Sequence, residues 1–283
     1  DIKKEAAKIV NEELTVDDSL FLYHDVCTNG IGYVDLMFKT DSIAPEQIPY
    51  LGLLKSVLGY VDTENYTYGE LFNEINANTG GINCGVEVFD RADSTEEFQA
   101  MFSVRGKALY TKMDFLFKMI GEILNSSKLE DTKRLYEIVA SVKSRAQVNL
   151  TGAGHSTAVL RAAAYSSPMA AFQDEMAGIG YYQFIEKLEK DFEQRKEETV
   201  EELCKLMKKI LRPENFMISY TGERESLETV QKLAGAVKAG LGTEPVEKSE
   251  EKLTCTKKNE GFKTSGQVQY VAQTGNFKKK GLE

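Results

Sequence analysis

Side chains that could perform catalysis are few in this sequence. Its two histidines, His24 and His155, fall in separate predicted elements, and no His-x-x-Glu-His or related spacing of metal ligands occurs. A catalytic zinc ion generally takes three protein ligands and keeps one position for water. Two distant histidines without a matching group of carboxylates do not meet that requirement. We therefore expect no metal site and no cofactor within this chain.

The segment around His155 has two further chemical interpretations, and both are weak. His155 directly precedes Ser156, and a histidine can activate a serine nucleophile, but adjacent residues rarely orient in that way and Gly-x-Ser-x-Gly is absent. Gly152-x-Gly154-x-x-Thr157 misses a dinucleotide loop, because it follows a helix pattern and lacks a third glycine. We interpret Gly154 and His155 as a structural turn whose imidazole fixes the local backbone.

Two basic side chains, Arg105 and Lys107, end a predicted strand and are the candidate substrate contacts. Their cationic groups suit the carbonyls or the C-terminal carboxylate of a peptide. A solvated strand end is the simpler alternative. Gly80 and Gly81 lie between a predicted helix and a predicted strand, and we expect them to supply the positive φ that ends the helix.

Length, composition and charge set wider limits. A chain of 283 residues with 42% apolar residues can bury a substantial core. The net charge of -9 argues against a general nucleic-acid or anionic-membrane partner. No apolar run approaches the ~20 residues that span a bilayer, and the four cysteines form no Cys-x-x-Cys pair. We expect a soluble, cytoplasmic protein.

Apolar periodicity divides the chain into the elements that must position these residues. Predicted strands cover residues 20–24, 33–38, 82–88, 98–104 and 216–220, and Asn29-Gly30 predicts a hairpin between the first two. Predicted helices cover residues 45–60, 68–78, 109–124, 135–146, 159–165, 181–188, 198–211 and 227–241. The order predicts an α+β fold with a mostly antiparallel sheet covered on one face by helices.

The same pattern divides the chain into regions. Residues 1–15 form a charged lead-in, in which Ala6, Ala7, Ile9 and Val10 make a short helical stripe. The expected α+β domain covers 16–242, a linker 243–261 and the start of a further domain 262–281, with its opening strand near 266–272. Leu282 and Glu283 are typical of a cloning remnant, so we expect a piece cut from a longer protein.

Taken together, four segments resemble the presequence-protease branch of the pitrilysin or insulinase family of zinc metallopeptidases. The resemblance covers about residues 15–275 and rests on Ile48-Pro49-Tyr50-Leu51, Thr79-Gly80-Gly81-Ile82, Val104-Arg105-Gly106-Lys107-Ala108, and Arg145-Ala146 followed by Gly152-Ala153-Gly154-His155 and Arg161. It implies a fold like that of LuxS and the mitochondrial processing peptidase. Such enzymes resemble two clamshell halves, each of two related domains, around a chamber that admits unstructured peptides.

The resemblance places this chain at the non-catalytic third domain, the "peptidase associated" region, with the first strand of the fourth domain after it. Where an active relative carries His-x-x-Glu-His, this chain reads Tyr50-Leu51-Gly52-Leu53-Leu54, so no catalytic residue carries over. The implied zinc belongs to a domain outside this chain. The implied partners are the N-terminal catalytic half of the same protein and unstructured peptides, and the acidic charge would favour basic ones.

We therefore expect a non-catalytic fragment from the C-terminal half of a zinc-dependent metalloendopeptidase, forming chamber wall and packing between the halves. The fragment alone is not expected to be an enzyme, whereas its parent is. The main alternative is a stand-alone structural or peptide-binding protein of the same fold without protease activity. A third possibility, an enzyme built around His155, predicts hydrolysis by the chain alone that is lost on His155→Ala.

Overall fold

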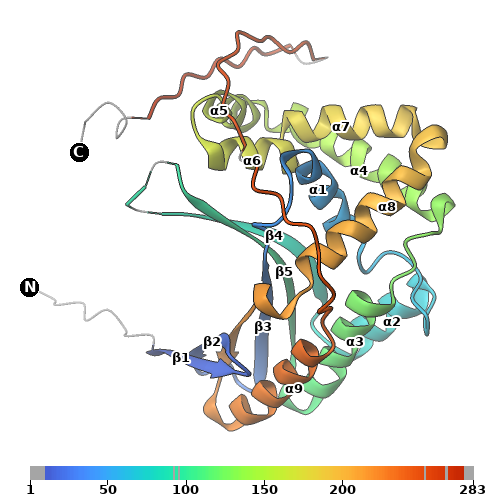
Figure 1. Cartoon of the computed structure of the whole chain (residues 1–283), viewed down its shortest axis with the longest axis vertical. Coiled ribbons are helices and arrows are strands. Elements are labelled where there is room, and N and C mark those ends of the chain that lie inside the picture. The colour runs from blue at the N-terminus through green and yellow to red at the C-terminus, as the bar shows by residue number, and fades with distance from the viewer. Residues whose placement is uncertain (1–9, 92, 95, 252, 265–266, 277–283) are drawn as a thin grey trace, which may run out of the picture.

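A computed structural model gives the structure of the chain and describes residues 10–91, 93–94, 96–251, 253–264 and 267–276. Within these residues, six strands form one sheet in the order β1-β2-β6-β3-β5-β4 (Figure 1). They are β1 (Val10–Val16), β2 (Ser19–Asp25), β3 (Ile31–Lys39), β4 (Ile82–Asp90), β5 (Phe98–Leu109) and β6 (Phe216–Gly222). The β2–β6 pair is parallel and the other pairs are antiparallel.

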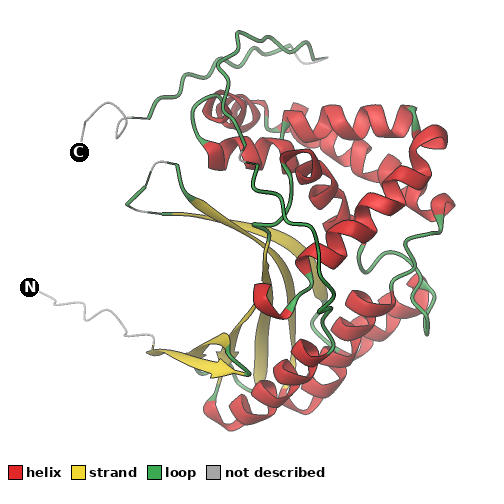
Figure 2. Ribbon diagram, viewed as in Figure 1, coloured by secondary structure: helices red, strands yellow, loops and turns green. Residues whose placement is uncertain are grey.

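Helices gather on one side of the sheet, and its concave side has no helix over it (Figure 2). The helices are α1 (Ile48–Val57), α2 (Tyr68–Asn78), α3 (Met113–Ser126), α4 (Thr132–Gly152), α5 (Gly154–Ala164), α6 (Pro168–Ala177), α7 (Ile179–Lys190), α8 (Phe192–Ile210) and α9 (Leu227–Ala239). Among these helices, none has both the length and the apolar character needed to cross a bilayer. The predicted α+β class, with helices on one face, is confirmed.

The core lies between the sheet and the helices. Phe21, Leu36 and Phe102 alternate with outward-facing neighbours on three strands and are fully buried. From the helical side, α3 contributes Met113 and Leu116, which are also fully buried, as the 3.6-residue period predicts. Each such side chain contributes roughly 1.5–3 kcal/mol by leaving water. This packing makes the sheet a rigid support for whatever its open face carries.

The predicted hairpin between β2 and β3 is wrong. β6 lies between them, parallel to β2 through Phe21↔Ile218 and antiparallel to β3 through Leu36↔Ile218. Alternation identifies each strand but not its partner, and a distant strand fits the gap here. The Asn29-Gly30 turn does form, with φ of 53° and 83°, but it belongs to a connection that passes the end of β6.

That connection is anchored by one carboxylate. Glu223, just after β6, accepts hydrogen bonds from the backbone N–H groups of Thr28 and Asn29 at 3.2 Å and of Gly30 at 3.3 Å. The Tyr110 hydroxyl donates to it at 2.5 Å. These bonds, that of Tyr110 above all, lower the pKa of Glu223 to about 2. The β2–β3 connection is thereby tied to an ionised side chain.

The sheet begins earlier than predicted. Val10 opens β1, which pairs with β2 along its whole length, so part of the expected lead-in is strand. Asp17 and Asp18 form the tight turn between the two strands, with φ of 47° and 65°. The predicted helical stripe is therefore wrong at Val10, while Ala6, Ala7 and Ile9 lie outside the described residues.

Two differences concern the later part of the chain. α6 was not predicted, although Ser167 caps it through the Ala170 N–H and Pro168 opens it. The strand expected near residues 266–272 is not formed, because the described residues 267–276 have no strand beside them to pair with. The boundaries at 16–242, 243–261 and 262–281 remain predictions, and Leu282 and Glu283 lie outside the described residues.

Candidate functional site

A shallow cavity of about 310 Å³ lies on the open face of the sheet. Its lining comes from β3, β4, β5, β6 and the turn before β4: Tyr33, Val34, Asp35, Gly80, Gly81, Asn83, Arg105, Gly106, Lys107, Ser219 and Thr221. The structure thus brings together four predicted site residues, Arg105, Lys107, Gly80 and Gly81. It does not place Gly154 or His155 there.

Strand register explains why Arg105 and Lys107 share this cavity. Successive side chains of a strand point to opposite faces, so the two lie on the same face of β5, whereas the buried Val104 faces the core. Across the ladder, Asp35 is the direct partner of Arg105, and Tyr33 is the direct partner of Lys107. Two strands therefore present four chemically different side chains next to one another.

Arg105 is not available as a free cation. Its Nε lies 2.7 Å from Asp35 Oδ2, and its Nη1 lies 3.2 Å from Glu87 Oε1 on β4. The hydrogen bond with Asp35 is the main cause that raises the pKa of Arg105. Two carboxylates thus neutralise this guanidinium and hold it across three strands. Its role is to fix the surface rather than to receive a second anion.

Lys107 has a different environment. Its Nζ lies 5.9 Å from the centre of the Tyr33 ring, and it makes no ion pair within the described part of the chain. Its stem runs over Gly80, where an added Cβ would come within 2.6 Å of Lys107 Cγ. Lys107 is therefore the cation of this cavity that can meet a ligand.

The two glycines do different things. Gly81 has a φ of 103°, which only glycine adopts readily, so the predicted positive φ is found here. Gly80 does not share it, and the predicted left-handed end of the helix at Gly80 is wrong. Its N–H donates instead to the Lys107 carbonyl at 2.8 Å, and its missing side chain lets the Lys107 stem lie close.

Sequence reasoning missed the acidic partner in this site. Asp35 Oδ2 takes the Arg105 bond, whereas its Oδ1 is buried and has no partner among the described residues. Together with Lys107, Asp35 gives the cavity a spare acceptor beside a spare donor. A peptide backbone offers the complementary pair, N–H and C=O, at every residue. The available signal was the outward position of Asp35 in its strand, but only the register shows that it faces Arg105.

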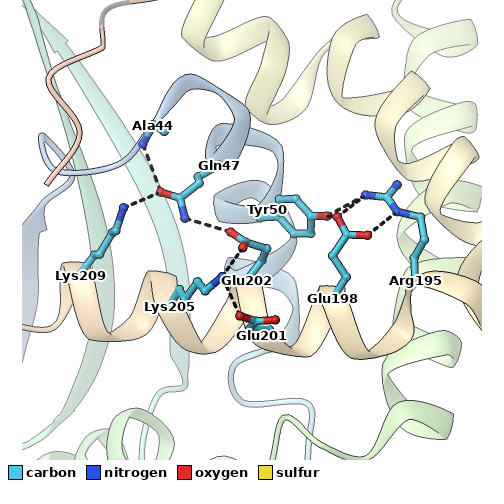
Figure 3. Close-up of polar contacts among 9 residues, drawn as sticks. All are labelled: Ala44, Gln47, Tyr50, Arg195, Glu198, Glu201, Glu202, Lys205 and Lys209. Carbon is cyan, nitrogen blue, oxygen red and sulfur yellow. Dashed lines mark hydrogen bonds and ion pairs between the residues drawn. The ribbon is translucent and has the colours of Figure 1, made fainter. Parts of the chain in front are cut away.

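Helix α1 shows what replaces the metal motif. Tyr50 is 6% exposed and Leu51 and Leu54 at most 1%, so these positions are packing residues. Figure 3 shows the Tyr50 hydroxyl pointing to α8, where it donates to Glu198 at 3.3 Å and accepts from Arg195 at 2.9 Å. Burial raises the pKa of Tyr50 to about 12. The place of a ligand is therefore taken by a contact between two helices.

The same two helices are joined by a second polar contact further along. Gln47 donates to Glu202 at 3.0 Å and accepts from Lys209 at 3.1 Å, both on α8 (Figure 3). In the part of the chain that the structure describes, no group of three His, Cys, Asp or Glu side chains could hold a metal ion. The residues present at α1 therefore do not fit zinc.

Gly154 and His155 lie at the start of α5. The helix breaks at Ala153, with φ of -117° and ψ of 41°, so the predicted interruption is a single residue between α4 and α5. His155 is exposed, and among the described residues it makes no hydrogen bond; its ring lies 6.2 Å from that of Tyr270. The structure does not support a backbone-fixing role for its imidazole. An added Cβ at Gly154 would come within 2.5 Å of the Tyr270 ring.

Comparison with known proteins gives full-length matches to the chain. It is 36% identical over 283 residues to "Protein HypA" of Clostridium perfringens, covering all of this chain and 29% of that protein. It is 26% identical over its whole length to "Presequence protease 1, chloroplastic/mitochondrial" of Arabidopsis thaliana, of which it covers 26%. The chain thus spans less than a third of the length of either relative.

The fold also has a solved counterpart. The crystal structure of a peptidase M16 inactive domain from Pseudomonas fluorescens matches 86% of this chain and 53% of that chain, with a TM-score of 0.56 and 15% sequence identity. At that identity the likeness concerns the fold alone. The family model of the associated region of M16 peptidases, subfamily C, matches residues 1–188. This chain therefore belongs to the associated-region family of the subfamily C peptidases of M16.

Proposed function

We propose that this chain is the non-catalytic wall domain of a zinc-dependent metalloendopeptidase that degrades unstructured peptides in a closed chamber. The open face of the sheet carries the proposal, because it presents Lys107 as an unpaired cation beside the neutralised Arg105. A wall needs a rigid polar surface of this kind, and the packed core behind the sheet provides it. The presequence proteases among its relatives agree with a peptide as the substrate class.

Catalysis is assigned to another part of the protein. Tyr50 is engaged with α8, and the apolar residues after it offer no zinc ligand, so this chain contributes no step of the reaction. We propose that zinc and its activated water belong to an N-terminal catalytic half, against which this domain packs. Comparable activity of the isolated chain on unstructured peptides would contradict this assignment. The assay compares the chain alone with the chain mixed with that half.

Lys107 and Asp35 are the proposed peptide contacts. The ammonium group can donate to a backbone carbonyl or to a C-terminal carboxylate, and the free Asp35 Oδ1 can accept from an N–H. The net charge of -9 adds a general attraction for basic peptides over acidic ones, over nucleic acid and over anionic membranes. Both effects act on binding, not on the chemical step.

The direct test is Lys107→Ala in the complete protein. We expect KM for an unstructured peptide to rise about threefold to tenfold, the loss typical of one charge-assisted hydrogen bond, with kcat unchanged. Lys232→Ala is the matched control, because this exposed lysine belongs to α9, on the covered side of the sheet. An unchanged KM for Lys107→Ala, or an equal change in the control, would remove the open face from peptide binding.

A further inference from the structure

A second cavity lies among the helices. Its volume is about 390 Å³, within the range of small-molecule sites, and no strand residue lines it. Ser56 of α1, Arg145 of α4, Ser156 of α5, Gly178 between α6 and α7, and Tyr181 of α7 define its sides. It is therefore separate from the open face of the sheet and from the peptide contacts proposed there.

Tyr181 places an unused polar atom in this cavity. The side chain is 5% exposed, and its hydroxyl has no hydrogen-bond partner among the described residues. Burial raises the pKa of Tyr181, while Ser56 and Arg145 act in the opposite direction, so the hydroxyl end lies toward two residues that line the cavity. The Ser56 hydroxyl itself donates to the Gly52 carbonyl. A buried phenol without a partner is costly, which makes this atom a candidate ligand contact.

Arg145 gives the cavity its charge. This exposed arginine makes no ion pair within the described segments, and no Asp or Glu of those segments lines the cavity. The chain as a whole has 44 acidic residues against 35 basic ones, so a cavity with one arginine and no carboxylate departs from its surroundings. The nearby Arg161, in contrast, is held by Asp174 and Glu260. The free charge of Arg145 favours an anion.

The start of α5 adds to this preference. The N-cap residue Ala153 has no side chain that could accept from the first-turn N–H groups, and no side-chain cap forms. Ala153, Ser156 and Thr157 all line the cavity. An uncapped helix start carries partial positive charge and free donors. The rest of the lining is largely apolar, through Val142, Leu150 and Leu160.

We propose that this cavity binds a small ligand with one carboxylate on an apolar body. Arg145 balances the single negative charge, the Tyr181 hydroxyl donates the second hydrogen bond, and the apolar side chains cover the body of the ligand. Two sources share this chemistry: the C-terminus of a short peptide that ends in an apolar residue, and a free organic acid. The cavity is independent of zinc chemistry and of the open sheet face.

The test is titration of the 15N-labelled chain with N-acetyl-leucine, N-acetyl-leucine amide and hexanoate, followed by NMR. We expect saturable shifts of the amides from Ala153 to Thr157 with N-acetyl-leucine and none with the uncharged amide. Arg145→Gln and Tyr181→Phe should each weaken binding about tenfold, as expected for one charge-assisted or buried hydrogen bond. Lys133→Gln removes a positive charge from an exposed position of the same helix and should leave binding unchanged.

The outcomes separate clearly. Binding of hexanoate as tight as that of N-acetyl-leucine assigns the cavity to free acids, and preference for N-acetyl-leucine assigns it to peptide C-termini. Equal shifts with acid and amide, or binding that survives Arg145→Gln, would overturn the proposal. Unshifted amides of the sheet in each variant verify that the fold is intact.

Discussion

Arg161 and Glu260 form a two-point contact between α5 and the C-terminal segment. The Arg161 Nε lies 2.8 Å from Glu260 Oε2 and its Nη2 lies 3.1 Å from Oε1, across a sequence separation of 99 residues. Asp174 binds the remaining nitrogen of the guanidinium at 2.5 Å, and Tyr165 donates to Glu260 at 2.5 Å. The segment that follows α9 is therefore held against the helical layer by one buried arginine, whose side chain is 11% exposed.

Replacing Glu260 by Gln should release this segment without unfolding the domain. The substitution removes one charge of a charge-assisted pair at nearly constant shape, a loss of about 1–2 kcal/mol for the docked segment. We expect faster tryptic cleavage after Lys263, by about tenfold, with the midpoint of global unfolding little changed. Glu251→Gln, at an exposed position of the same segment, is the control. Unchanged cleavage in Glu260→Gln would show that other contacts hold the segment.

Glu223 should make stability depend on pH in the acid range. Its pKa is lowered from 4.5 to about 2 by its bonds to Tyr110 and the β2–β3 connection. A lowered pKa in the folded state stabilises the protein above pH 4.5, and this contribution is lost as the pH falls toward 2. In urea unfolding at a series of pH values, Glu223→Gln should be less stable than the unchanged protein at pH 6. The difference should disappear near pH 2. A difference that is constant over this range would contradict the assignment.

The elements were largely predictable from the sequence because their signals are local. The buried stripe of Met113 and Leu116 repeats at helical spacing, and the alternation from Ile82 and from Phe98 marks strands that the structure confirms. Pairing was not predictable in the same way. β6 enters between β2 and β3 from far along the chain, and no local pattern reports such a partner.

The candidate site divides along the same line. Arg105 and Lys107 could be selected from their place at a strand end, but they look alike in the sequence. What separates them is Asp35, which lies opposite Arg105 in the β3–β5 ladder and neutralises it. Such a partner depends on register, which needs the paired strands. The unpaired Tyr181 hydroxyl depends in the same way on how α1, α4 and α7 meet.

Gly81 and Gly80 should respond differently to alanine. Gly81→Ala forces a Cβ onto a backbone with φ of 103°, at a cost of about 1–2 kcal/mol. Gly80→Ala meets only the flexible Lys107 side chain, which can move aside, so its cost should be below about 1 kcal/mol. Chemical denaturation of both variants measures the two costs. The opposite order would mean that the Lys107 stem, rather than the Gly81 backbone, limits this turn.

Tyr181→Phe should stabilise the unliganded protein. The hydroxyl is buried without a partner among the described residues, so its removal relieves a desolvation cost of about 1 kcal/mol while the ring keeps its packing over Gly52. Tyr23→Phe is the matched control with the opposite sign, because the buried Tyr23 hydroxyl donates to the Gly222 carbonyl at 3.1 Å and that carbonyl would lose its bond. Urea unfolding of both variants gives the comparison. A loss of stability in Tyr181→Phe would assign the hydroxyl a structural bond, whereas a gain together with weaker binding of N-acetyl-leucine is the combination expected of an atom kept for a ligand.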